Sequence, residues 1–478
     1  MDAASPRHGI IPPMATGKQN DSIRVAVLLV ATLAAFLTPF MGSSINIALP
    51  SIGEHYQMDA VLLSWVATAY LLAAAVSLVP FGRLADIYGR KKIFTLGMII
   101  YTIASLLLAF APSAVYLIAL RAVQGLGSGM IFGTAVAMLT SVYPPAQRGR
   151  ALGINVAAVY LGLSLGPFLG GLLTQHLGWQ SVFLVNVPLG LIVVAVTFWR
   201  LKPEWAEAKG EKFDLAGTLV YSAGLVALMY GFSLLPQSLG FWIIAAGIAG
   251  IVAFIAWEMR TAQPILNMNL FRRNNVFAFS NLAAFINYSA TFAVTFLLSL
   301  YLQYPKGLSP QGAGIILVAQ PAVQAIFSPF AGRLSDRIPP RTIASIGMAL
   351  TTAGLIILAF IDLNSTTLFI VASLVVLGMG FGLFSSPNTN AIMSAVERRT
   401  YGVASGILAT MRLTGQMFSM GIAMLLIAIF MGRVEIAPEH YPALVRSMQV
   451  AFIVFAAMCF VGIFASLARG KASTSSES

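Results

Sequence analysis

Apolar stretches of about 20 residues follow one another along almost the whole chain, and no other feature of the sequence constrains the fold as strongly. A helix needs about 20 apolar residues to cross the hydrocarbon core of a bilayer. Fourteen such stretches lie at residues 24–47, 61–81, 93–111, 114–140, 151–174, 181–200, 215–234, 239–257, 276–303, 311–331, 342–361, 366–387, 402–430 and 447–468. Unpaired backbone groups are not tolerated in hydrocarbon, so these stretches predict helices. The chain is therefore predicted to be an all-α integral membrane protein with 14 transmembrane helices.

The composition supports this prediction and argues against a nucleic-acid partner. Of the 478 residues, 58% are apolar and only 9% are charged, which is too little polar surface for a protein surrounded by water. The formal net charge is +12. The basic residues are spread over short loops and form no single patch, as expected if they set membrane orientation.

The distribution of basic residues predicts the orientation. With a cytoplasmic N-terminus, 23 of the 28 Lys and Arg residues lie on the inner side. Three lie outside (Lys306, Arg433 and Arg446), and Arg121 and Arg412 lie within spans. Residues 1–22 lack the apolar core of a signal peptide and are expected to form a cytoplasmic tail. We therefore expect a multi-pass protein of the inner (plasma) membrane with both termini in the cytoplasm.

A basic turn occurs twice, each time after the second span of a six-span unit. The 82–92 turn contains Gly82, Asp86, Gly89 and Arg90, and its counterpart is the 332–341 turn with Gly332 and Asp336. Repeated units of this kind are typical of membrane carriers. The predicted segments are an N-terminal tail (1–22), a six-helix bundle (23–200), a cytoplasmic linker (201–214), two extra helices with a loop (215–274), a second six-helix bundle (275–469) and a C-terminal tail (470–478).

Further motifs occur in a fixed order around these turns. Residues 46–50 read Asn-Ile-Ala-Leu-Pro, residues 121–127 read Arg-Ala-Val-Gln-Gly-Leu-Gly, and residues 213–217 read Phe-Asp-Leu-Ala-Gly. Over residues 24–468 the chain resembles the major facilitator superfamily, and in particular its fourteen-helix drug/proton antiporters. The resemblance implies two six-helix bundles, with two extra central helices, that rock around a site at the middle of the membrane.

The resemblance also implies a gating role for the two turns. Asp86 is expected to meet basic residues and the N-terminus of the helix near Tyr401 when the inner side is closed. The alternative is a basic turn that serves only topology. A third motif on the fifth span consists of Gly162, Gly166 and Gly170, which recur every four residues, and of Pro167, which opens the local hydrogen-bond ladder. This face is expected to pack closely against a neighbouring helix, and the resemblance adds that it shapes the cavity.

Polar residues inside spans are the candidates for a substrate site. An arginine facing lipid at the depth of Arg121 or Arg412 costs at least roughly 2.5 to 3.5 kcal/mol, so both are expected to face the central cavity. The alternative for Arg121 is a structural role, bonded to carbonyls and Gln124, and a structural role is likewise the alternative for Arg412. The remaining cavity candidates are Met41, Asn46, Tyr70, Gln320, Gln324 and Gln416.

The chain lacks an acidic residue at a position where the fourteen-helix antiporters usually have one. An acid commonly precedes the Asn46 motif by five positions, but Met41 stands there, and all 16 Asp and Glu fall in tails, loops or span ends. Proton coupling through the first helix is therefore not expected. The lone Cys459 and four scattered histidines predict no metal site, and no nucleophile–base pair predicts an enzyme.

The predicted function is transport of a small organic solute, as drug or metabolite efflux by alternating access. One alternative is a facilitator or importer of an anionic metabolite, favoured by two arginines without an acid. Another is a membrane receptor that does not transport. We expect a monomer in the lipid bilayer without a cofactor, and leave the coupling ion open between protons and another ion.

Overall fold

The computed structural model describes residues 17–261, 263–266, 268–335, 337–397 and 400–469. Within these ranges the regular structure is entirely helical, and 14 helical segments are long and apolar enough to cross a membrane. The prediction of an all-α integral membrane protein with 14 spans is confirmed.

The first half of the chain contains α1 (Gly17–Tyr56), α2 (Ala60–Tyr88), α3 (Arg90–Leu108), α4 (Ala114–Val142), α5 (Pro145–Leu177), α6 (Gln180–Leu184) and α7 (Asn186–Arg200). Two central helices follow, α8 (Leu215–Leu234) and α9 (Ser238–Glu258), and then the short α10 (Asn269–Arg273). The second half contains α11 (Asn275–Gln303), α12 (Pro310–Leu317), α13 (Ala319–Leu334), α14 (Pro340–Leu358), α15 (Thr367–Ser394), α16 (Tyr401–Phe430), a 3₁₀ turn (Pro438–His440) and α17 (Tyr441–Leu467).

Two predicted spans are each divided into two helices. The span expected at 181–200 breaks at Val185, between α6 and α7, and the span expected at 311–331 breaks at Val318, between α12 and α13. In each case a proline follows three residues after the break, at Pro188 and Pro321. Proline has no N–H to bond the carbonyl four residues earlier. The missing bond weakens the helix at each of these two breaks.

Short polar side chains mark where several helices begin. Asp59 accepts a hydrogen bond from the backbone N–H of Leu62 before α2, at 2.8 Å, and Thr366 accepts one from Phe369 before α15, at 3.2 Å. Such caps pair N–H groups that have no partner within the helix. The sequence thus sets the ends of these helices locally.

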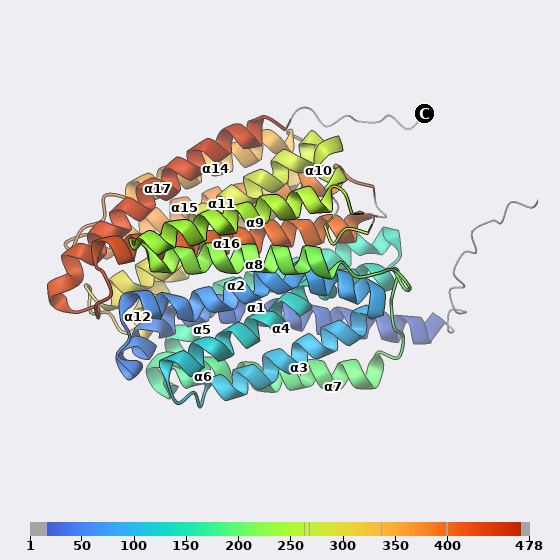
Figure 1. Ribbon diagram of the computed structural model, residues 1–478, viewed down its shortest axis with the longest axis horizontal. Helices are drawn as coiled ribbons and strands as arrows, with labels where there is room; N and C mark the ends of the chain where they lie inside the picture. The colour runs from blue at the N-terminus through green and yellow to red at the C-terminus, as the bar shows by residue number, and fades with distance from the viewer. Residues whose placement is uncertain (1–16, 262, 267, 336, 398–399, 470–478) are drawn as a thin grey trace, which may run out of the picture.

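The helices pack into two bundles with the same pattern of partners. In the first bundle α1 packs on α5, α2 on α4, and α3 on α4 and α7. The equivalent pairs in the second bundle are α11 with α16, α13 with α15, and α14 with α15 and α17. The two bundles lie one above the other in Figure 1, with α1 to α7 below and α11 and α14 to α17 above. This agreement supports an internal duplication.

The central helices α8 and α9 pack on each other and lie at the boundary between the bundles (Figure 1). The side of α8 contacts both α2 and α16. The hydroxyl of Tyr221 on α8 donates to the carbonyl of Ala75 on α2, at 3.0 Å, and Phe232 on α8 packs edge-on against Phe418 on α16. The α8 helix therefore bridges the two bundles.

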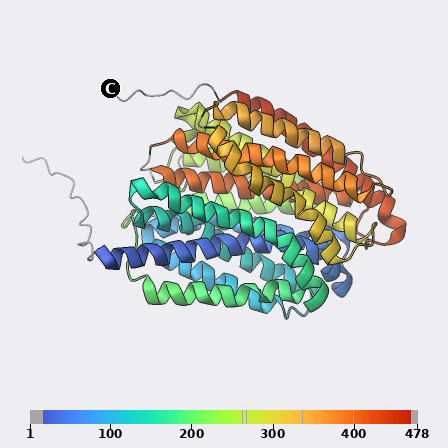
Figure 2. The same ribbon diagram turned by 180° about the vertical axis from the view of Figure 1, so that it is seen from behind.

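The helices run roughly along the long axis of the molecule, so the protein has two ends (Figures 1 and 2). We call the end where α1 begins and α17 finishes the terminus end, and the opposite end the distal end. The 82–92 turn and the linker 201–214 lie at the terminus end. The connection from α1 to α2 lies at the distal end.

Candidate functional site

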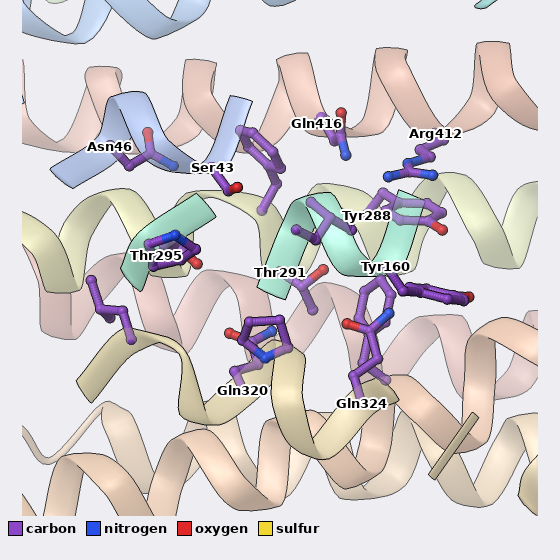
Figure 3. Close-up of a pocket in the computed structure, with 16 residues that line it drawn as sticks. Ser43, Asn46, Tyr160, Tyr288, Thr291, Thr295, Gln320, Gln324, Arg412 and Gln416 are labelled. Carbon is purple, nitrogen blue, oxygen red and sulfur yellow. The ribbon is translucent and has the colours of Figure 1, made fainter. Parts of the chain in front are cut away.

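A cavity lies between the two bundles, near the middle of the helices, and we call it the central cavity. Side chains from α1, α5, α11, α13, α15 and α16 line it, together with Leu317 at the end of α12. Its polar and tyrosine side chains are Ser43, Asn46, Tyr160, Tyr288, Thr291, Thr295, Gln320, Gln324, Arg412 and Gln416. Figure 3 shows Arg412 and Gln416 on one side of this cavity and Gln320 and Gln324 on the other.

Arg412 is the positively charged group of the cavity. Its guanidinium carbon lies 5.5 Å from the centroid of the Tyr288 ring, a distance at which the cation is attracted to the ring face. No acidic residue is among the described residues that line the cavity. The field inside the cavity therefore favours anionic solutes or solutes rich in hydrogen-bond acceptors.

Three amide side chains at the cavity offer unpaired atoms. Oδ1 of Asn46, Oε1 of Gln320 and Nε2 of Gln324 are buried and make no hydrogen bond to the protein. Buried polar atoms normally find a partner. These amides can therefore bind water or a polar solute that enters the cavity.

Tyr160 connects the two bundles beside the cavity. Its hydroxyl and that of Ser385 on α15 lie 2.8 Å apart and share a hydrogen bond. Ser43, Tyr160, Tyr288, Thr291 and Thr295 were not among the predicted cavity residues. Hydroxyl groups occur on many faces of membrane helices, so no sequence signal separates these positions from others.

The structure places four predicted cavity residues elsewhere. Met41, Tyr70, Arg121 and Gln124 are buried within the first bundle and do not line the central cavity. The sulfur of Met41 faces Nδ2 of Asn186, at 3.4 Å. The helices that carry these four residues turn the corresponding faces toward neighbouring helices of the same bundle. The side chains therefore pack inside the bundle and do not reach the cavity.

Arg121 instead forms a network inside the first bundle. Its Nε donates to the carbonyl of Val66 at 2.9 Å, and its Nη1 donates to Oε1 of Gln124 at 2.5 Å. Its guanidinium carbon also lies 4.4 Å from the ring centroid of Tyr70. Nε2 of Gln124 continues the network to Ser105, at 2.8 Å. This geometry matches the structural alternative for Arg121.

Hydrogen bonds between the bundles close the distal end. The hydroxyl of Ser299 donates to the carbonyl of Asn46 at 2.6 Å, and the amide of Gln303 donates to the carbonyl of Ile47 at 3.1 Å. Nearby, the backbone N–H of Gln311 donates to the side chain of Gln175, at 3.2 Å. These bonds hold the two bundles together on the distal side of the cavity.

Glycines make this closure possible. A Cβ added to Gly171 on α5 would lie 2.5 Å from the carbonyl oxygen of Pro310, and one added to Gly314 on α12 would overlap the carbonyl of Pro167. The predicted glycine face of α5 meets α1: added Cβ atoms at Gly162, Gly166 and Gly170 would all collide with residues of α1. The face of α5 that carries Gly162, Gly166 and Gly170 thus packs within its bundle. The adjacent Gly171 packs against the second bundle.

The 82–92 turn is covered by the linker 201–214. Arg90 donates from Nε to Oδ1 of Asp86 at 2.8 Å, and from Nη1 and Nη2 to the two carboxylate oxygens of Glu207, at 2.6 and 2.9 Å. Arg83 pairs with Glu211, and the backbone N–H of Lys91 donates to Glu204 at 2.9 Å. These three glutamates were not among the predicted site residues. Their charge is opposite to that of the turn, and this sequence signal could have identified them.

The backbone of the 82–92 turn also contacts the linker 201–214. Gly89 has a φ of 124°, a conformation that L side chains rarely adopt, and a Cβ there would overlap the side chain of Glu204. The backbone N–H of Arg90 donates to the carbonyl of Trp205 at 2.8 Å, and that of Ala208 to the carbonyl of Asp86 at 2.9 Å. The turn and the linker thus form one unit. In this arrangement Asp86 is paired with Arg90, and no hydrogen bond joins its side chain to α16 in the described part of the chain.

The second turn differs from the first. Gly332 lies at the end of α13, where an added Cβ would come within 2.9 Å of Oγ of Ser386. The hydroxyl of Ser335 accepts a hydrogen bond from Asn390 at 2.8 Å. Asp336, predicted to share the gating role, lies outside the described residues.

Comparison with known proteins agrees with this architecture. The family model described as Major Facilitator Superfamily matches residues 31–280 and 280–477. The cephamycin export protein CmcT of Amycolatopsis lactamdurans is 32% identical, with 90% of this chain and 96% of that protein covered. The riboflavin transporter RibZ of Clostridioides difficile is 29% identical, with 91% and 95% covered.

Two more proteins extend the comparison. The multidrug resistance protein Stp of Mycobacterium tuberculosis is 31% identical, with 84% of this chain and 75% of Stp covered. Among solved structures, a mutant of the nucleoside transporter NupG is similar with a TM-score of 0.58, covering 95% of this chain and 100% of that one. Because its sequence identity is only 15%, this likeness concerns the fold alone.

Proposed function

Because the chain belongs to the major facilitator superfamily of membrane transporters, we propose that it moves a small organic solute through the central cavity by alternating access. The observation that carries this proposal is a polar cavity between two bundles that is closed at the distal end by inter-bundle hydrogen bonds. Rocking of the bundles about this cavity would open the distal end and close the terminus end. The duplicated packing of the two bundles supports such a motion.

The proposed direction is export from the cytoplasm. The terminus end is taken as cytoplasmic because 23 of the 28 basic residues belong to segments predicted on that side. The similarity to a cephamycin export protein and a multidrug resistance protein supports efflux of an organic compound. Both bundles and the whole cavity lie within one chain, so a monomer is sufficient for this activity.

A second candidate is uptake or facilitated passage of an anionic metabolite. The specific observation in its favour is Arg412, a cation in a cavity whose described lining residues include no acid. A cation inside a membrane protein attracts anions more strongly than the same cation in water. The similarity to a riboflavin transporter also favours a polar aromatic solute.

Binding and flux measurements test the proposal. Purified protein in detergent is screened by thermal shift against anionic, neutral and cationic aromatic compounds, and those that stabilise it are followed in liposomes. Export is supported if flux proceeds from the terminus side and Gln320→Leu or Gln324→Leu lowers affinity. If stabilising compounds bind these two variants as well as wild type, the cavity is not the binding site.

A further inference from the structure

A groove of about 380 Å³ runs between α14 and α17. Eight residues line it, and all except the first are apolar: Thr352, Ile356, Ala359, Phe360, Ile453, Ala456, Ala457 and Phe460. The two helices lie at the upper edge of the molecule in Figure 1, away from α1 to α7. Among the described residues, none lines both this groove and the central cavity. The groove is therefore a separate space within the second bundle.

Small side chains beside large ones leave this groove open. Three of the lining residues are small: Ala359, Ala456 and Ala457. The four large apolar ones are between 49% and 75% exposed: Ile356, Phe360, Ile453 and Phe460. The hydroxyl of Thr352 donates to the carbonyl of Met348 at 2.9 Å, so its proton already has a partner. Both helices are long and apolar enough to span the membrane. The groove therefore opens toward lipid hydrocarbon.

A cation lies on the same face of α17, nearer the distal end. Arg446 precedes Ile453 by seven residues, which places the two on nearly the same side of the helix, about 10 Å apart along its axis. Arg446 is exposed, and its Nη1 donates to Oε1 of Gln449 at 3.2 Å. In the part of the chain that the structure describes, Arg446 makes no ion pair. Its charge is available to an anion at the distal end of the groove.

The loop between α14 and α15 is fixed beside this cation. Side chains bind three consecutive carbonyls of the loop: Gln449 that of Ile361 at 2.7 Å, Tyr301 that of Asp362 at 2.6 Å, and Lys306 that of Leu363 at 2.8 Å. The carboxylate of Asp362 accepts hydrogen bonds within its own loop, from Asn364 and Ser365. A ligand that binds here therefore pays little to order the loop.

We propose that the groove and Arg446 together bind one anionic glycerophospholipid, with an acyl chain in the groove and the headgroup phosphate at Arg446. Lipid tails are as apolar as the groove, so a chain alone gains only packing contacts there. A guanidinium and a phosphate form charge-assisted hydrogen bonds, which select the headgroup. A second copy of the chain, docked symmetrically, would instead bring a second unpaired Arg446 to the same place. The site belongs to one bundle and does not depend on the proposed transport.

Native mass spectrometry tests this proposal on the purified chain titrated with phosphatidylglycerol. Arg446→Gln is expected to weaken binding of the tightest lipid about tenfold. Ala457→Trp fills the groove from an exposed position and should cause a similar loss. The matched controls are Arg433→Gln, an exposed arginine that bonds the carbonyl of Ser233 at 3.0 Å, and Ala249→Trp, at an exposed alanine of α9. Both controls should bind the lipid as wild type does.

The headgroup provides an independent measurement. Phosphatidylcholine carries the same phosphate beside a compensating cation, so wild-type protein should bind it at least about threefold more weakly than phosphatidylglycerol. Equal affinities for the two lipids would contradict the role of Arg446. Unchanged phosphatidylglycerol binding in Arg446→Gln or in Ala457→Trp, or an equal loss in the matched control, would overturn the proposal. A dimer that persists when lipid is added and dissociates in Ala457→Trp would assign the groove to a second copy of the chain instead.

Discussion

The side-chain amide of Gln303 donates a hydrogen bond to the carbonyl of Ile47, 256 positions earlier in the chain, at 3.1 Å. The same nitrogen also donates to Oγ of Ser299, at 3.0 Å. Ser299 in turn donates to the carbonyl of Asn46. Two side chains of α11 thus bind consecutive carbonyls of α1, and this contact joins the two bundles on the distal side of the cavity.

Removing this contact should loosen the distal end. Gln303→Ala deletes two hydrogen bonds, each with a net value of about 0.5 to 1.5 kcal/mol. Modification of Thr295→Cys by a membrane-impermeant thiol reagent added from the distal side should become about fivefold faster, in a Cys459→Ala background. The control is Gln449→Ala, because Gln449 bonds the carbonyl of Ile361 within one bundle at 2.7 Å. Equal effects of both variants would mean that Gln303 serves general stability.

Replacing Arg412 should selectively weaken binding of anions. Arg412→Gln removes the positive charge of the cavity, and a hydrogen bond to a charged group is worth about 1.5 to 3 kcal/mol, so affinity for an anionic aromatic solute should fall roughly 10- to 150-fold. Arg412→Lys keeps the charge but lacks the planar guanidinium, so its affinity for the anionic solute should lie between those of wild type and Arg412→Gln. Binding is measured by thermal shift with an anionic and a cationic compound of similar size. Equal losses for both compounds would exclude a charge-selective role.

Arg121→Lys is expected to act through stability. A lysine cannot reproduce the bonds to both Val66 and Gln124, and a buried acceptor left unpaired costs about 1 to 3 kcal/mol. The Tm of the purified variant should fall, and flux per folded molecule should stay close to wild type. Circular dichroism melting and flux in liposomes provide the two measurements. An unchanged Tm together with lost transport would instead assign Arg121 a direct part in transport.

Reporter fusions test the orientation. The 23-to-3 partition of basic residues predicts that both termini lie in the cytoplasm. A reporter fused after Ser478 should be active as a cytoplasmic enzyme, and one inserted after Gln237, between α8 and α9, should be active outside. The same location for both reporters would refute the fourteen-span topology with cytoplasmic ends.

Proton coupling should not pass through α1. Met41 cannot titrate and lies against Asn186 inside the first bundle. A carrier that moves one charge down 100 mV gains about 2.3 kcal/mol, enough for a solute gradient of roughly 50-fold. In liposomes with an imposed pH gradient, wild-type protein is expected to equilibrate its solute without uphill accumulation. If uphill flux occurs and disappears in Glu54→Gln or Asp59→Asn, protons enter through the distal end instead.

Several features were predictable because they depend on short stretches of sequence. The length of each apolar run determines whether a helix can span the membrane. The repeated turns and ordered motifs were sufficient to infer duplication and the superfamily. Placing Arg121 and Arg412 in the cavity rested on the cost of charge in lipid alone, and that cost is avoided equally well inside a bundle.

The tertiary structure decided which polar residues share a space. Arg121 and Arg412 both lie within spans, yet Arg121 turns toward Val66 and Gln124 inside its bundle and Arg412 turns toward the cavity. The pairing of Glu207 with Arg90 joins residues 117 positions apart. The rotation of a helix about its axis, and the path of a linker over a turn, are set by packing among many distant side chains. Hydrophobic length determines that a helix crosses the membrane, but only this packing determines the direction in which each side chain points.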